Sequence, residues 1–210
     1  PWLEFRRVLF RSVGKTRICG LLAKRLFQQK INVITQKWVQ TGSKNPDDLR
    51  IHCDLMKKTV SDKDLDLQNP YRFAYPASPH LAAQKENKTI SLPLLKKKSE
   101  ALRKKTDVLL IETSGGLLVP YTPKKSQLDL MASTGYPVLL VSANRLGTLN
   151  HTFMSLSILR ENQIPVLGDL LNEVAPNTTQ DIQDDNAAMI QSLGKIPVLY
   201  RIDRKSTRLN

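Results

Sequence analysis

Apolar residues along this chain recur with two spacings, one typical of amphipathic helices and the other of buried strands. Between residues 17 and 30 they return every three or four positions, which predicts a helix. Helices are also predicted over residues 47–58, 92–105, 148–160 and 181–193, and strands over residues 32–39, 107–111, 137–142, 166–171 and 196–202. Residues 62–79 are polar and punctuated by prolines, so we expect a long connection there. Apolar strands that alternate with helices predict an α/β fold, a parallel sheet with helices on both faces.

Part of a phosphate-binding motif stands at the start of the first predicted helix. Gly14-Lys15-Thr16 matches the end of the loop G-x-x-x-x-G-K-[ST], the mark of P-loop NTPase-like folds. In such a loop, backbone N–H groups and a helix N-terminus converge on phosphates, the lysine adds positive charge and the hydroxyl binds Mg²⁺. The leading glycine would fall at position 9, which is Leu9. On these residues alone, simple helix capping is an equal alternative.

An acid ends the apolar strand predicted over residues 107–111. Glu112 stands there, and Ser114-Gly115-Gly116 follows almost at once. Small residues allow the backbone to approach a ligand closely, and ligands of parallel sheets bind beyond the carboxyl ends of the strands. We therefore expect Glu112 to reach the metal of a bound nucleotide. The alternative is a strand that merely ends at a charged turn.

The chain is strongly basic, with a formal net charge of +13, which raises the possibility of a nucleic-acid-binding module. Its basic residues are scattered or form short runs such as Lys96-Lys97-Lys98, the pattern of a solvated face. Only 6% of the residues are aromatic, and no alternation of basic and aromatic residues suggests base stacking. We therefore expect no nucleic-acid partner.

Other classes of protein and site are disfavoured as well. No apolar run approaches the roughly 18 residues of a membrane span, so no membrane partner is expected. Cys19 and Cys53 form neither a metal-binding spacing nor a disulfide framework, which favours a reducing, cytoplasmic setting. The histidines are not at metal spacing and are expected to have local structural roles: His52, His80 and His151.

Both ends of the chain match translated sequencing-adaptor DNA. Leu3 to Ser12 reads LEFRRVLFRS, and Asp203 to Asn210 reads DRKSTRLN. One adaptor in two orientations encodes both segments. We therefore expect residues 1–12 and 203–210 to be non-native and residues 13–202 to be a single domain, incomplete at both ends. A chain without the leading glycine is expected to be inactive.

Seven segments, in order, resemble dethiobiotin synthetase. Lys37-Trp38-Val39-Gln40-Thr41-Gly42 matches that family's lysine–proline–x–x–Ser/Thr–glycine segment, and Asp54 falls at its second metal-binding acid. The other matches are Val13-Gly14-Lys15-Thr16, Asn69 to Ala74 with Pro76 to His80, Glu112-Thr113-Ser114-Gly115-Gly116, Arg145-Leu146-Gly147-Thr148-Leu149-Asn150-His151, and Asn172. The Pro76 to His80 stretch argues against two related ATPases of the same loop class, the partitioning ATPases and the cobyrinate amidating synthetases.

The resemblance implies an ATP-dependent ligase of biotin biosynthesis. Its substrates would be 7,8-diaminononanoate, CO₂ and ATP, with Mg²⁺ as cofactor, and it would form a carbamate, then a carbamic–phosphoric anhydride, then the cyclic urea of dethiobiotin. In the family the substrate lies at a subunit interface, so a homodimer is implied.

The resemblance also implies roles for individual residues. Catalysis would use Lys15 and Lys37, and Mg²⁺ would be held by Thr16, Asp54 and Glu112. The nucleotide would contact Gly14, Lys15, Thr16, Glu112, Gly115 and Asn172, and the substrate would contact Lys37, Thr41, Thr148, Leu149 and Asn150. The last three open a predicted helix, whose N-terminus suits a carboxylate.

Four positions depart from the family pattern. Trp38 replaces proline, which brings a bulky ring near the site whose effect the sequence leaves open. Thr113 and Ser114 replace glycine and alanine, which reduces backbone freedom there. Arg145 replaces lysine, a change that keeps the charge but not the geometry.

Overall fold

A computed structural model describes residues 13–60, 62–173 and 178–202, so both predicted adaptor segments, Leu9 included, lie outside the described residues. The chain forms two compact units. The first unit comprises residues 16–134, and the second comprises residues 13–15 and 135–202 of the described chain. None of the described helices is long and apolar enough to cross a membrane.

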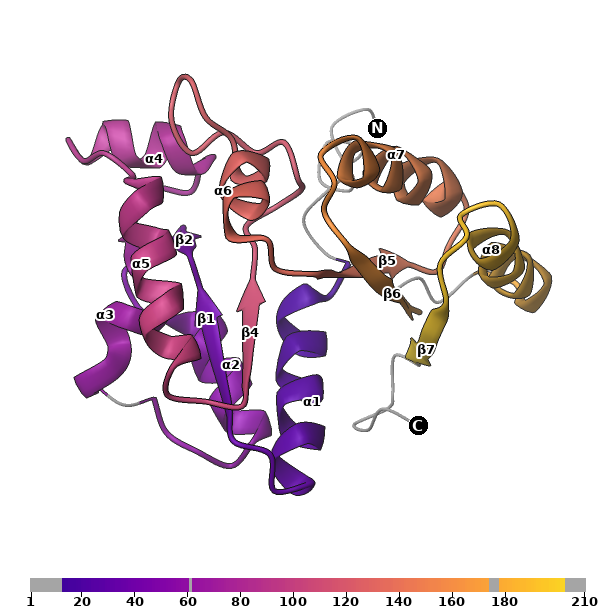
Figure 1. Cartoon of the computed structure of the whole chain (residues 1–210), viewed down its shortest axis with the longest axis horizontal. Coiled ribbons are helices and arrows are strands. Elements are labelled where there is room, and N and C mark those ends of the chain that lie inside the picture. Colours follow the sequence, from indigo (N-terminus) through magenta and orange to yellow (C-terminus); the bar gives the residue numbers. More distant parts are fainter. Residues whose placement is uncertain (1–12, 61, 174–177, 203–210) are drawn as a thin grey trace, which may run out of the picture. The chain divides into compact units, whose positions relative to one another are not determined.

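The first unit is built around two parallel strands. β1 (Val33–Lys37) pairs with β4 (Val108–Glu112) in a register that places Lys37 opposite Glu112 (Figure 1). Helices α1 (Lys15–Gln28) and α2 (Asp47–Leu55) pack their apolar residues on one face of this pair, whereas α3 (Leu65–Gln68) and α5 (Leu92–Arg103) contact the other. The expected covering of the sheet on both faces is therefore confirmed for this pair.

The rest of the first unit is made of short elements. β2 (Val39–Thr41) and β3 (Tyr71–Phe73) form a second parallel pair. A 3-10 turn spans Asp62–Asp64, and two further helices are α4 (Pro79–Lys85) and α6 (Gln127–Thr134). The expected strand over residues 32–39 is thus divided at Trp38. The expectation of a mere connection over residues 62–79 was wrong, because β3 and α3 form there through contacts with β2 and β1.

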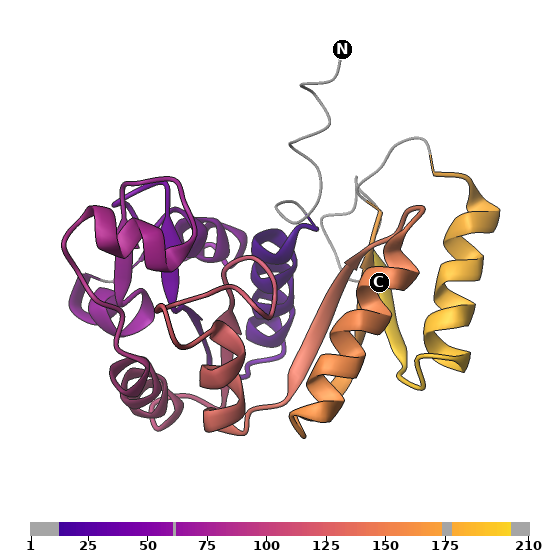
Figure 2. The same cartoon turned by 90° about the horizontal axis from the view of Figure 1, so that it is seen from above.

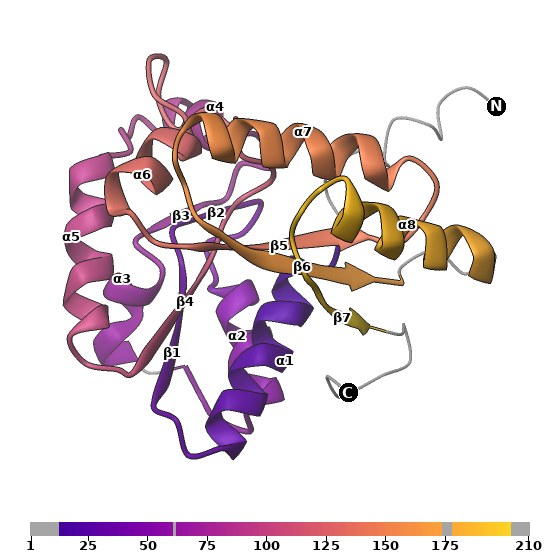
Figure 3. The same ribbon diagram turned by 45° about the vertical axis from the view of Figure 1, so that its right-hand side comes forward.

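The second unit has a parallel sheet in the order β5 (Val138–Ala143), β6 (Val166–Asn172), β7 (Val198–Ile202). Helices α7 (Thr148–Glu161) and α8 (Gln180–Ser192) lie together on one face of it, as Figures 2 and 3 show. Leu156, Leu171 and Ile190 join the two helices to the sheet in one buried cluster.

A buried carboxylate lies within the central strand of this sheet. Asp169 on β6 is fully buried, and its carboxylate oxygens have no hydrogen bond of ordinary geometry within the described residues. Burial raises the pKa of Asp169 to about 6 from an ordinary value of 3.8, although the neighbouring Ser142 hydroxyl opposes the shift. Because ionisation must occur in an apolar interior, the folded state binds the proton more tightly than the unfolded chain does.

Replacing Asp169 by asparagine should therefore change how stability depends on pH. A carboxyl group whose pKa is raised by folding contributes stability below its unfolded pKa and loses it as the pH rises through the folded value. Relative to Asp169→Asn, the parent chain should lose about 2–3 kcal/mol of unfolding free energy between pH 4 and pH 7. Urea unfolding at several pH values measures this. The exposed Asp185→Asn serves as the control, and parallel stability curves for the parent and Asp169→Asn would contradict the prediction.

Candidate functional site

The candidate site of the first unit is built around the Glu112 carboxylate at the end of β4. Its Oε1 accepts a hydrogen bond from the Thr16 hydroxyl at 2.7 Å and lies 2.8 Å from Lys37 Nζ. Thr16 is in the first turn of α1, and the parallel register brings Lys37, the last residue of β1, beside Glu112. Three residues predicted from separate motifs are therefore brought together.

A second carboxylate, which the sequence motifs did not predict, completes this group. Asp48, in the first turn of α2, places Oδ2 2.7 Å from Lys37 Nζ, and its Oδ1 lies 3.4 Å from the Thr16 hydroxyl. We call Thr16, Lys37, Asp48 and Glu112 the carboxylate cluster. A sequence signal existed, because acids at the start of a helix that soon follows the Lys37 to Gly42 segment are well placed to face it.

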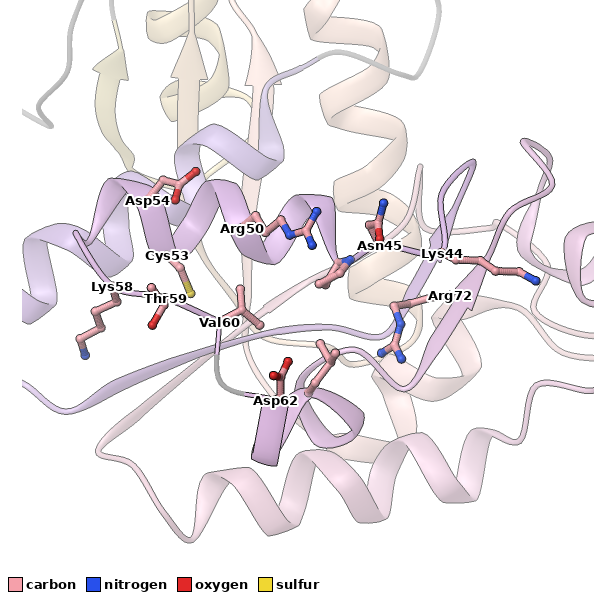
Figure 4. Close-up of a pocket in the computed structure, with 12 residues that line it drawn as sticks. Lys44, Asn45, Arg50, Cys53, Asp54, Lys58, Thr59, Val60, Asp62 and Arg72 are labelled. Carbon is pink, nitrogen blue, oxygen red and sulfur yellow. The ribbon is translucent and has the colours of Figure 1, made fainter.

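Asp54 is not brought to this cluster. It lies on α2 six residues after Asp48, which is about one and two-thirds helical turns, so it faces another side. Its side chain is exposed and lines a polar pocket of about 520 Å³, together with Arg50, Lys58 and Asp62 (Figure 4). The structure therefore places Asp48, and not Asp54, beside Thr16, Lys37 and Glu112.

In the carboxylate cluster, opposite charges stabilise the charged form of their neighbours. Burial alone would lower the pKa of Lys37, but Glu112 and Asp48 raise it above its usual value. Burial alone would raise the pKa of Glu112, but His52 and Lys37 lower it to about 2. The cluster therefore holds a buried ammonium and an ionised carboxylate at neutral pH.

In the second unit, Gly14 of the phosphate-loop motif packs against Asn172. The Asn172 amide donates a hydrogen bond to the Val13 carbonyl at 2.8 Å. Gly14 has φ +83°, and a Cβ at this position would lie 2.2 Å from Asn172 Nδ2. Gly14 is thus required both by its backbone conformation and by this close approach. Asn172 anchors the motif's backbone in addition to the base-reading role expected of it.

A second turn follows Glu112 and is fixed by the buried Gln127. Its amide accepts a hydrogen bond from the Ser114 N–H at 2.9 Å and donates one to the Gly116 carbonyl at 3.1 Å. Gly115 between them is exposed and has φ +68°. Ser114 also donates a hydrogen bond to the Val39 carbonyl at the start of β2. The Ser114 hydroxyl, a departure from the family pattern, therefore fixes this turn.

Comparison with known proteins identifies the family. Residues 11–207 match the profile of a family described as an AAA domain. The ATP-dependent dethiobiotin synthetase BioD 2 of Haemophilus influenzae is 42% identical over 163 residues, which cover 77% of this chain and 85% of the relative. The corresponding BioD of Chlorobaculum tepidum is 38% identical over 199 residues, 90% of this chain and 82% of the relative. The chain belongs to the dethiobiotin synthetase family.

Solved structures agree on the fold. The septum site-determining protein MinD of Pyrococcus horikoshii, complexed with Mg-ADP, aligns with a TM-score of 0.58 at 16% identity, covering 93% of this chain and 78% of that one. The cell division ATPase MinD of Pyrococcus furiosus gives 0.54 at 17% identity, covering 92% and 79%. At such identity the likeness shows the fold alone, and it confirms the P-loop NTPase-like prediction.

The donors of the carboxylate cluster suit the magnesium ion expected of a dethiobiotin synthetase. Mg²⁺ prefers oxygen ligands and is usually held by one or two carboxylates, with substrate phosphates and waters completing the shell. Thr16, Asp48 and Glu112 offer a hydroxyl and two carboxylates. Among the described residues, no group of three or more His, Cys, Asp and Glu side chains is arranged to hold a metal by itself. The cluster thus fits a metal whose remaining ligands come from a nucleotide.

The remaining predicted substrate residues lie at two places. Thr41 ends β2, and a Cβ at the following Gly42 would lie 3.6 Å from Pro76 of the proline-rich stretch typical of the family. In the second unit, Thr148, Leu149 and Asn150 form the first turn of α7 after Gly147, which has φ +87°. Thr148 is buried and Asn150 is exposed, so a helix N-terminus is present where the sequence predicted one.

Trp38, the first of the departures from the family pattern, does not enter the carboxylate cluster. Its ring is buried, and its indole N–H donates a hydrogen bond to the Ser99 hydroxyl of α5 at 2.9 Å. Ser99 in turn donates to Gln36 Oε1 at 2.7 Å. Lys37 lies between Gln36 and Trp38 and points to the opposite face of β1, where it meets α2.

Replacing Trp38 by phenylalanine should lower stability without changing nucleotide binding. The change deletes the indole N–H and leaves the buried Ser99 hydroxyl with one partner fewer, which costs about 1–2 kcal/mol of unfolding free energy. Urea unfolding and ADP titration measure the two quantities. Ser99→Ala removes the hydrogen-bond acceptor of the Trp38 indole. The double variant should therefore lose less unfolding free energy than the sum of the losses in the two single variants. Weakened ADP binding in Trp38→Phe with unchanged stability would place the ring in the site after all.

Proposed function

We propose that this chain is an ATP-dependent ligase that converts 7,8-diaminononanoate and CO₂ to dethiobiotin. The observation that carries the proposal is the buried ammonium of Lys37, held between Asp48 and Glu112 beside the hydroxyl of Thr16. A fixed cation next to a phosphate-loop threonine suits a reaction in which charge develops on phosphoryl oxygens. Membership of the dethiobiotin synthetase family supplies the substrates.

The reaction balances without an external oxidant or reductant. One amine of the diamine adds to CO₂ and loses a proton, which forms a carbamate. A carbamate oxygen attacks the γ-phosphorus of ATP and ADP leaves, which gives the carbamic–phosphoric anhydride. The second amine attacks the carbamate carbon and loses a proton, phosphate leaves with the C–O bond electrons, and the cyclic urea closes.

The chain's own residues have the following proposed roles. Lys37 stabilises charge on the carbamate and the transferred phosphoryl group, and Thr41 at the end of β2 contacts the carbamate. Gly14 and Lys15 bind the phosphates, with Gly115 beside the nucleotide, and Asn172 reads the base. Thr148, Leu149 and Asn150 bind the substrate carboxylate at the start of α7.

Thr16, Asp48 and Glu112 are proposed to hold Mg²⁺, with Asp48 in place of Asp54. Bound Mg²⁺ would neutralise charge on the phosphate oxygens. The family also supports a homodimer that shares its substrate sites, and the free cysteines Cys19 and Cys53 support a cytoplasmic setting.

The test of this function is product formation. Incubation with the diamine, bicarbonate, ATP and Mg²⁺ should yield dethiobiotin and ADP in equal amounts, measured by mass spectrometry. We expect this of a family-end variant, in which residues 1–12 become a family-type strand and glycine-containing loop and a family-type end follows Ile202. The chain as given is proposed to be inactive. A family-end variant that binds ATP but forms no dethiobiotin would overturn the proposed substrate.

A further inference from the structure

A buried histidine lies against the far side of the Glu112 carboxylate. His52 is on α2, one helical turn after Asp48, and its side chain has no exposed surface. Its Nε2 lies 3.1 Å from Glu112 Oε2, at an angle that differs from that of an ordinary hydrogen bond.

The two oxygens of Glu112 therefore face different partners. Oε1 faces Thr16 and Lys37, at 2.7 and 2.8 Å, and Oε2 faces His52. The last torsion of a glutamate side chain is broad, so covalent geometry does not fix how its carboxylate is turned. Without His52, Oε2 would be a buried carboxylate oxygen with no polar side chain facing it, and the carboxylate would gain by rotating toward Lys37.

The packing of α1 on α2 sets the position of His52 independently of its charge. A Cβ at Gly20 of α1 would lie 3.2 Å from the Cα of His52 and 2.6 Å from Leu55 Cδ1. The two helices thus touch backbone to backbone at the histidine because Gly20 has no side chain. This close approach places His52 against the second turn of α1.

We propose that His52 is a positioning residue that fixes Glu112 Oε2 and so keeps Oε1 aimed at the metal site. The inference rests on the proposed role of Glu112 as a magnesium ligand. Residues that orient a metal ligand usually change metal affinity by about 10–100-fold when they are replaced. His52 acts only through Glu112 and touches neither substrate nor nucleotide.

The test uses Mn²⁺ as the probe ion and measures its binding by electron paramagnetic resonance on the family-end variant, here the parent chain, with saturating ADP. His52→Leu should weaken Mn²⁺ binding by about 10–100-fold and leave ADP binding without metal unchanged. His52→Gln, whose amide can stand near the position of Nε2, should stay within about threefold of the parent. Leu102→Val, a buried change on α5, controls for lost stability and should not alter Mn²⁺ binding.

Three kinds of result would overturn the proposal, and each has a different meaning. If Glu112→Gln loses Mn²⁺ while His52→Leu binds it like the parent, His52 does not position Glu112, although the metal site stands. If the parent chain binds no Mn²⁺, or Glu112→Gln binds it normally, the proposed metal site itself fails. If His52→Gln binds Mn²⁺ as weakly as His52→Leu does, an N–H group at this position is not sufficient to orient Glu112, which also counts against the proposal.

Discussion

Replacing Lys37 by methionine in the family-end variant should lower dethiobiotin formation by about a thousandfold. Methionine has nearly the length of lysine but no charge. Removal of one preorganised group that stabilises developing charge typically costs a hundred- to a thousandfold in rate. Lys37 is at the upper end of that range because its ammonium is buried and already held by two carboxylates, so it needs no reorganisation when charge moves to the phosphoryl oxygens.

The same substitution should destabilise the fold in a metal-dependent way. Loss of Lys37 leaves Asp48 and Glu112 close together without the cation between them, and removing one partner of a buried ion pair costs about 3–5 kcal/mol. Millimolar Mg²⁺ should restore part of this loss in Lys37→Met and have a smaller effect on the parent. Thermal unfolding with and without Mg²⁺ measures it.

A matched control is available within the first unit. Lys125 forms an ion pair with Asp129 at 2.8 Å, the same length as that of Lys37 with Glu112, but its side chain is 60% exposed. Lys125→Met should change neither product formation nor the response to Mg²⁺, because exposed ion pairs contribute little. If Lys37→Met retains a tenth or more of the parent rate, Lys37 is not the cation that stabilises the reacting phosphoryl group.

The fold followed from local patterns wherever an element has a clear apolar pattern. The apolar run that ends at Glu112 predicted both β4 and the place of its acid, although only Glu112 itself is fully buried in this strand. The pattern at residues 92–105 likewise predicted α5, which ends at Arg103. The pairing of Lys37 with Glu112 could be expected from parallel strands that end at one edge.

Elements that form through distant contacts were not predictable from the sequence. α3 has four residues and exchanges side-chain hydrogen bonds with β1, through Gln36 to the Leu67 carbonyl and Gln68 to the Thr35 carbonyl. β3 has three residues and exists by pairing with β2. Segments this short have too few positions to display a periodicity, so tertiary contacts decide their structure.

Within the site, the sequence pattern likewise could not decide between Asp48 and Asp54. Both acids lie on the helix predicted over residues 47–58, and a polar position on a helix does not reveal which neighbour it faces. The direction in which each acidic side chain of α2 points is set by the approach of α1 to α2 at Gly20. This contact joins residues that are 32 positions or more apart in the sequence. Only the folded arrangement turns Asp48 toward Lys37 and leaves Asp54 exposed.

Asp48→Asn and Asp54→Asn should therefore have opposite outcomes. Asparagine keeps the size of the side chain but removes the charge and one oxygen ligand. Asp48→Asn should weaken Mg²⁺-dependent nucleotide binding by about a hundredfold and remove measurable dethiobiotin formation, because a carboxylate is a far better Mg²⁺ ligand than a neutral amide. Asp54→Asn should leave both within about twofold of the parent, as expected of an exposed acid outside the cluster.

The measurement is a Mg²⁺ titration of ATP binding by calorimetry on the family-end variant, followed by the product assay. Glu112→Gln provides the positive control, since Glu112 contacts Thr16 and Lys37 directly. Because Asp48 also pairs with Lys37, ATP binding without Mg²⁺ must be measured in parallel. Asp48→Asn should retain ATP binding in the absence of Mg²⁺. If the substitution also disturbs Lys37, ATP binding should be weakened both with and without Mg²⁺. Loss of metal dependence in Asp54→Asn, with Asp48→Asn unaffected, would return the second metal ligand to Asp54 and require α2 to turn when the nucleotide binds.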